Sequence, residues 1–242
     1  MKGLKTIVCG LCAALVLSSC NMSNTGKGSL IGAGGGAALG AALGALIGGG
    51  SGTGIAIGAA LGTAAGTTTG YLIGKKMDKA KAAAEQVANA EVTDAVDQNG
   101  YQAVKVTFDS GILFKTGDAT LNDAARASLL QFATTVLKPN ADMNVGIVGY
   151  TDNTPFKNST AEQSAAKNQE LSLKRAQSVS NCLLSQGVSS AQIKEVAGLG
   201  ESNPVADNST VEGKKQNRRV EVFLYASDEM IKAAQAEAAA QN

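Results

Sequence analysis

The acidic residue best placed for chemistry is Asp152, which directly follows the apolar run MNVGIVGY at residues 143–150 and Thr151. The chain contains no histidine, and Cys182 is the only cysteine outside the first twenty residues. Acyl-transfer triads and zinc sites therefore lack their usual residues. The other carboxylates of this half of the chain show no spacing that fixes a catalytic pair. The sequence thus favours a binding role over an enzymatic one and implies no metal or cofactor.

Two basic segments accompany this carboxylate further along the chain. Arg175 lies in LSLKRA, and Asn217-Arg218-Arg219 leads into the alternating segment VEVFLYA. Each has an ordinary interpretation: Asp152 as a turn residue bonding its own backbone, Arg175 as a surface arginine, and the Arg-Arg pair as protection of an edge strand. Taken singly, none of these residues predicts a site.

The elements that must position these residues form an α+β pattern. Residues 101–108 and 219–225 alternate as strands, and residues 143–150 form an apolar core strand. Residues 121–137, with Thr120 as a possible cap, and 171–186 have helical apolar periodicity, and a further strand is expected near 193–197. The order β-α-β-α-β-β predicts a mixed sheet with two helices on one face, a two-layer sandwich. Asn99-Gly100 is a hairpin signal before the first strand, and the polar end from residue 227 is expected to be a helix or frayed.

The N-terminus has the features of an export signal. A cationic start, MKGLK, precedes a short apolar core that is too short for a membrane span. Leu17-Ser18-Ser19-Cys20 resembles the lipobox of bacterial lipoproteins, although a signal peptide with an incidental Cys20 is the alternative. Cys9 and Cys12 would leave with the signal and Cys20 would carry lipid, so no intrachain disulfide is expected.

A glycine-rich block follows, with no charged residue between Lys27 and Lys75. Glycines recur at every fourth position and Ala, Leu and Ile fill the gaps, which predicts close-packed helices rather than a flexible linker. GGGSGTG at 48–54 breaks the period, so we expect two helices, at about 31–47 and 55–73. Whether they enter a membrane is left open, since they are at the lower limit of spanning length. The same small-residue faces could pair between molecules to give a homo-oligomer or a pore. The absence of an ionisable residue argues against a proton-coupled stator.

The C-terminal segments together resemble the OmpA-like peptidoglycan-binding domain. The resemblance rests on GYTDNTP, NQELSLKRAQSV and GLGESNPVADNSTVEGKKQNRRVEV and covers about 105–225. The lipobox and glycine zipper extend it to outer-membrane lipoproteins of the YiaD type. The resemblance implies that the domain binds, without catalysis, the diaminopimelate in the stem peptides of peptidoglycan.

The resemblance assigns a role to each residue of the motifs. Asp152 would take the ammonium group of diaminopimelate, and Arg175 would fork onto its carboxylate with two parallel charge-assisted bonds. The other positions matching the family's ligand site are Thr151, Asn168, Leu171, Phe114 and the pair Arg218 and Arg219, of which one is expected to brace the pocket. Lys115 stands where the family often has Asp, and the connection between Asp152 and Arg175, through 154–167, is longer than in most relatives.

These features predict the following organisation: a lipoprotein signal peptide (1–19), a lipidated linker (20–30), a glycine-zipper helical hairpin (31–74), a solvated helical spacer (75–96), an OmpA-like domain (97–226) and a polar tail (227–242). The expected protein is anchored in the outer membrane by lipid and binds peptidoglycan in the periplasm. With a formal net charge of +1 and no basic stripe, nucleic acid is not an expected partner.

Overall fold

The computed structural model describes residues 67–97 and 99–240. The expected signal peptide, the lipidation site Cys20 and most of the glycine-zipper hairpin lie outside the described residues. Among the described helices, none is both long enough and apolar enough to cross a membrane.

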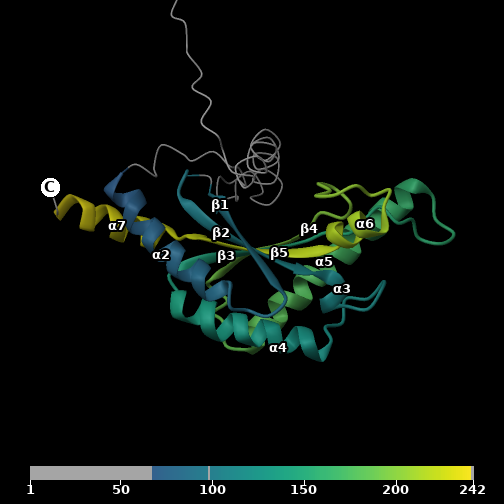
Figure 1. Cartoon of the computed structure of the whole chain (residues 1–242), viewed down its shortest axis with the longest axis horizontal. Coiled ribbons are helices and arrows are strands. Elements are labelled where there is room, and N and C mark those ends of the chain that lie inside the picture. The colour runs from purple at the N-terminus through teal and green to yellow at the C-terminus, as the bar shows by residue number, and fades with distance from the viewer. Residues whose placement is uncertain (1–66, 98, 241–242) are drawn as a thin grey trace, which may run out of the picture.

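A five-stranded sheet with the order β1-β2-β5-β3-β4 forms the centre of the domain (Figure 1). Its strands are β1 (Ala90–Val96), β2 (Gln102–Asp109), β3 (Met143–Gly149), β4 (Ile193–Gly198) and β5 (Arg219–Ala226). The pairs β1–β2, β2–β5 and β3–β5 are antiparallel, whereas β3 and β4 are parallel. The mixed sheet and the predicted β-α-β-α-β-β order are confirmed, with β1 added at the edge. β5 lies in the middle of the sheet, so the edge-strand interpretation of the Arg-Arg pair is wrong.

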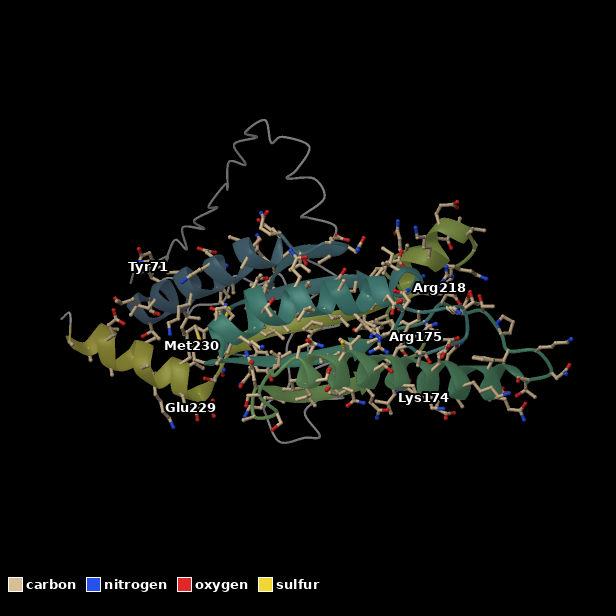
Figure 2. All side chains as sticks on the ribbon, turned by 90° about the horizontal axis from the view of Figure 1, so that it is seen from below. Tyr71, Lys174, Arg175, Arg218, Glu229 and Met230 are labelled. Atoms are coloured by element: carbon tan, nitrogen blue, oxygen red, sulfur yellow. The ribbon has the colours of Figure 1, made fainter. Side chains whose placement is uncertain are left out.

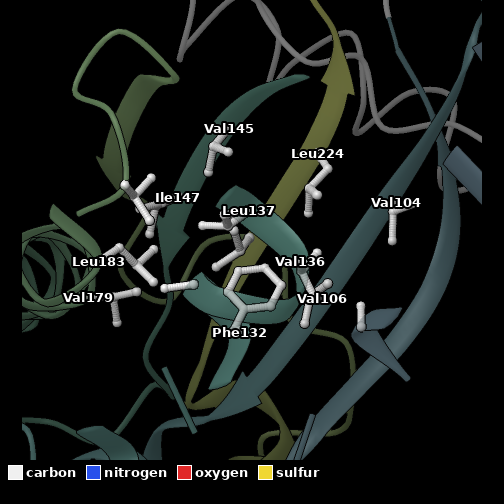
Figure 3. Close-up of a cluster of buried hydrophobic side chains, with 14 of the residues drawn as sticks. Val104, Val106, Phe132, Val136, Leu137, Val145, Ile147, Val179, Leu183 and Leu224 are labelled. Carbon is white, nitrogen blue, oxygen red and sulfur yellow. The ribbon is translucent and has the colours of Figure 1, made fainter. Parts of the chain in front are cut away.

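Helices α4 (Asp123–Phe132) and α5 (Ala161–Ser185) pack on one face of this sheet. The core between the layers is aliphatic and aromatic, and Phe108 meets Phe132 edge-to-face with ring centroids 5.7 Å apart. Figure 3 shows Phe132 of α4 and Val179 and Leu183 of α5 directed at the strand residues. Asn122, rather than Thr120, caps α4, because its side chain accepts a hydrogen bond from the Ala125 N–H at 2.8 Å. The expected two-layer architecture is thus present.

The segment expected to be a solvated spacer is instead part of the domain. Residues Thr68–Ala84 form helix α2, which begins inside the predicted zipper hairpin and runs past its expected end at residue 74. Ile73, Met77, Ala80 and Ala84 are fully buried at helical spacing and join the hydrophobic core. The charged residues between them conceal this stripe in the sequence. Strand β1 occupies most of what remained of the predicted spacer.

The C-terminal tail is likewise an ordered helix, α7 (Asp228–Ala240), that packs against α2. Met230, Ala234 and Ala238 are buried, and the first two belong to the main core. Figure 2 shows α7 beside α2, with the labelled Met230 between their axes. The helical alternative expected for this tail is therefore confirmed, but the helix is not frayed and not polar all round, because Met230, Ala234 and Ala238 recur at every fourth position and form one buried face.

Candidate functional site

Two glycines allow helix α5 to approach the sheet closely near the site. A Cβ atom at Gly149, the last residue of β3, would lie 2.1 Å from the carbonyl oxygen of Ser172. A Cβ at Gly198, the last residue of β4, would lie 2.2 Å from the Leu173 nitrogen. Only residues without a side chain fit such contacts. Because Asp152 and Arg175 each lie three residues beyond this crossing, the contact brings both to the same end of the domain.

Helix α5 is longer than the sequence indicated. It begins at Ala161, and Thr160 and Gln163 form a capping box in which each side chain bonds the other's backbone N–H. Arg175 is consequently the fifteenth residue of the helix and not in its first turns. The long connection predicted at 154–167 is half loop and half helix, so the added residues extend α5 beyond the sheet.

A cleft of about 830 Å³ opens at this end of the domain. Its walls come from the loop after β3, helix α5, the segment after β2 and the junction before β5. Seven of the eight predicted ligand residues line it: Phe114, Thr151, Asp152, Asn168, Leu171, Arg175 and Arg218. Figure 2 shows the labelled Arg175 and Arg218 at the same end of the molecule.

Asp152 is 5% exposed and uses both of its carboxylate oxygens. Oδ1 accepts a hydrogen bond from the Thr154 N–H at 2.8 Å, so the residue does close its own turn. Oδ2 is paired with Nη1 of Arg218. Burial alone would raise the pKa of this carboxyl, but the hydrogen bonds from Arg218 and Thr154 hold the pKa below its ordinary value. The carboxylate is therefore anionic at neutral pH.

Arg175 is a buried cation that forms no direct ion pair with the residues the structure describes. It is 3% exposed, its Nε donates to the Asp118 carbonyl at 3.0 Å, and its guanidinium lies over the Phe114 ring at 5.3 Å from the centroid. No carboxylate of the described residues forms an ion pair with it. Burial lowers its pKa, and the charge of Arg218 lowers it further. The charges of Asp152 and Asp118 oppose this lowering of the pKa from a greater distance. A guanidinium stays charged in proteins, so the site holds a positive charge that no direct ion pair of the described residues neutralises.

The two arginines before β5 separate onto different sides of the chain. Arg218 has an extended conformation and Arg219 begins the strand, so their side chains point in opposite directions. Arg218 lines the cleft, whereas Arg219 bonds Glu221 at 2.7 Å and lies 3.8 Å over the Tyr150 ring. Arg219 lines a second cleft, of about 840 Å³. The prediction that it contributes to the ligand site is therefore not supported, and its role is to hold a buried ion pair.

The remaining predicted residues shape the cleft wall. Asn168 is buried and donates from Nδ2 to Glu201 Oε2 at 3.0 Å, and Leu171 supplies an apolar surface. Thr151 is also buried, but its hydroxyl has no hydrogen-bond partner among the described residues. The same is true of Ser110, which the sequence did not indicate. Its position directly after β2, in α3 (Ser110–Leu113), was the only signal available.

Two family models and several known proteins match parts of the chain. Residues 113–218 match the OmpA family, and residues 1–78 match the YMGG-like Gly-zipper family. Over 115 residues the chain is 41% identical to the Probable lipoprotein YiaD of Escherichia coli (strain K12). This match covers 48% of this chain and 48% of that protein. Over 88 residues the chain is 44% identical to the Peptidoglycan-binding protein ArfA of Mycobacterium tuberculosis. This match covers 36% of this chain and 24% of that protein. The matches span less than half of the length of both relatives.

A solved structure supports the fold independently of close sequence similarity. The crystal structure of a putative MotB-like protein from Desulfovibrio vulgaris superposes on 66% of this chain and 96% of its own, with a TM-score of 0.53 at 23% identity. At that identity the likeness concerns the fold alone. The family matches confirm the resemblances stated from the sequence: residues 113–218 are a domain of the OmpA family, preceded by a glycine-zipper segment of the YMGG type.

Proposed function

We propose that the cleft binds peptidoglycan non-covalently by holding the free amino-acid end of diaminopimelate in the stem peptide. The observation that carries this proposal is Arg175, a buried guanidinium with no carboxylate partner in the described part of the chain. Burying an unpaired charge is costly, so a ligand carboxylate is the natural partner. The planar guanidinium offers this carboxylate a bidentate geometry.

Asp152 supplies the opposite charge that a zwitterionic ligand needs. Its carboxylate is already bonded to Arg218 and to the turn, which fixes its position before a ligand arrives. An anionic carboxylate has about four lone-pair sites, so it can accept an ammonium group without releasing both partners. Arg218 thus acts as a brace for Asp152, and no proton transfer is required.

The proposal extends to the whole protein as a tether. Lipid on Cys20 would hold one end in the outer membrane, and the cleft would hold the other end on the cell wall. The lipobox, the glycine zipper and the likeness to one relative named a lipoprotein and another named a peptidoglycan-binding protein support this assignment. The domain would then lie in the periplasm.

Co-sedimentation with purified sacculi tests the proposal. We expect wild-type protein to pellet, and Asp152→Ala and Arg175→Ala to lose about 2–5 kcal/mol of binding free energy, since each leaves a charge without its partner. Lys174→Ala is the matched control, because Lys174 is adjacent in sequence, exposed and paired with Glu170. Equal retention of all four proteins would refute the clamp.

A further inference from the structure

We infer that the cleft also selects stem peptides whose neighbouring carboxylates are free rather than amidated, through Lys115 and Lys157. This inference rests on the proposed function and adds to it a second contact class, beyond the diamino acid itself. Its basis is the charge of the cleft wall. Four basic side chains line the cleft, Lys115, Lys157, Arg175 and Arg218, against one carboxylate, Asp152.

The excess of positive charge is local to the cleft. Arg218 compensates Asp152, which leaves Arg175 and the two lysines, and neither lysine forms an ion pair within the described ranges. Asp118, outside the cleft lining, offsets part of the charge of Lys115 and Arg175, so the wall keeps a smaller positive excess centred on Lys157 and the inner end of the cleft. The formal net charge of the whole chain is only +1. A concave wall of one sign concentrates the field and favours an oppositely charged ligand.

A diamino-acid end cannot satisfy this excess. It brings one ammonium and one carboxylate, so its own net charge is zero and the positive excess of the cleft wall is unchanged by its binding. The cleft volume of about 830 Å³ lies near the top of the usual 300–1,000 Å³ range for ligand sites. The space therefore admits more of the peptide than one residue. In a stem peptide the anionic groups within reach are the α-carboxylate of the adjoining γ-linked glutamate and the terminal carboxylate.

Two buried hydroxyl groups support a larger polar ligand. Ser110 and Thr151 line the cleft, are 1% and 4% exposed, and have hydroxyl groups with no partner in the described structure. Buried polar groups are nearly always hydrogen-bonded, so these two indicate a ligand that completes them. A carboxylate accepts from hydroxyl groups as well as from ammonium groups.

The two lysines suit selection by charge rather than by rigid geometry. Both are exposed at the cleft, and a lysine is a flexible point charge. Their contribution should therefore weaken as salt screens it, whereas the buried Arg175 should be screened much less.

Calorimetric titration of the protein distinguishes these contributions. The ligands are free diaminopimelate, the tripeptide L-Ala-γ-D-Glu-diaminopimelate, and the same tripeptide amidated on the glutamate α-carboxylate. The proteins are wild type, the double variant Lys115→Gln/Lys157→Gln, and the control Lys174→Gln outside the cleft. We expect wild type and control to prefer the unamidated tripeptide by about two- to thirtyfold, since two exposed lysine–carboxylate pairs each contribute weakly. This preference should fall at high salt and disappear in the double variant, with the affinity for free diaminopimelate changed less than twofold.

An equal affinity of wild type for the two tripeptides would overturn the inference, as would a preference that survives in the double variant. Both results leave the proposed function intact if free diaminopimelate still binds and Arg175→Ala abolishes its binding. Failure of all three ligands to bind wild type would overturn the proposed function and this inference together.

Discussion

The substitution Gly149→Ala tests whether the close contact between β3 and α5 sets the geometry of the cleft. The added Cβ would lie 2.1 Å from the Ser172 carbonyl oxygen, whereas carbon–oxygen contacts seldom fall below about 3.3 Å. The helix or strand must therefore move by about 1.2 Å. Overpacking of this kind typically costs 1–3 kcal/mol. In a domain of this size, that corresponds to a fall in the unfolding temperature of about 2–12 °C.

The displacement should also impair binding beyond the loss of stability, because it moves Arg175 relative to Asp152. A shift of about 1 Å between positioned groups is enough to weaken a site strongly. We expect folded Gly149→Ala protein, at a temperature well below its transition, to bind sacculi at least tenfold more weakly than wild type. Thermal unfolding followed by circular dichroism and sacculus co-sedimentation measure the two effects separately.

Gly74→Ala in α2 is the matched control. Its Cβ would approach only the flexible Gln102 side chain, at 3.1 Å, and alanine is favoured over glycine in a helix by about 1 kcal/mol. This variant should be as stable as wild type or more stable, with unchanged binding. If Gly149→Ala behaved in the same way, the argument that this contact positions the site would be refuted.

Three further predictions follow from the structure. Met77→Ala should lower the free energy of unfolding by about 2–5 kcal/mol in urea titrations, because Met77 is fully buried in α2; no change would restore the solvated-spacer interpretation. Retention on sacculi should be constant between about pH 5 and pH 7 and fall in more acidic washes, because the pKa of Asp152 lies below its ordinary value of 3.8 and its charge is lost only as pH falls through the folded value. Glu195→Gln should raise the unfolding temperature at pH 8 but not at pH 4. Burial raises the pKa of Glu195 to about 7, so the contribution of its protonated form to folding stability is fully present below about pH 4.5 and is lost as pH rises through 7. Glutamine does not ionise, so the variant does not suffer this loss. A difference in unfolding temperature that does not change with pH would contradict this.

The elements with strong periodicity could be predicted from the sequence, and those without it could not. The alternation in YQAVKVTF and the apolar run MNVGIVGY identified β2 and β3, since each buries one or both faces. Strand β1 lies at the sheet edge and only Ala95 of its seven residues is buried, so AEVTDAV has no clear pattern. In α2 the buried residues are separated by lysines and acids, and a charged, alanine-rich composition is shared by solvated helices. Tertiary packing decided both cases.

The candidate site was predictable as a set of residues but not as a set of contacts. The positions of Asp152 and Arg175 followed from the motifs, because the fold brings the end of β3 against the middle of α5. That Arg218 rather than Arg219 enters the cleft depends on the register of β5, and a shift of one residue would reverse them. The pairing of Arg218 with Asp152 depends on which side-chain conformers the cleft permits, and sequence spacing carries no information about that choice.

The two charges of the clamp differ in what they contribute to the folded state. Asp152 closes a turn and pairs with Arg218, so its charge is compensated before any ligand binds. Arg175 has no direct ion pair among the described residues, and Asp152 and Asp118 offset its charge only from a greater distance; it keeps one hydrogen bond, to a carbonyl oxygen, and lies over an aromatic ring. A buried charge that the fold leaves unpaired lowers stability, and such costs persist in proteins where function requires them. A fold selected for stability alone would have paired both charges or replaced both residues with apolar ones. The observed difference, one carboxylate fixed by the fold and one arginine left without an ion pair, is instead what a binding site for an anionic group requires.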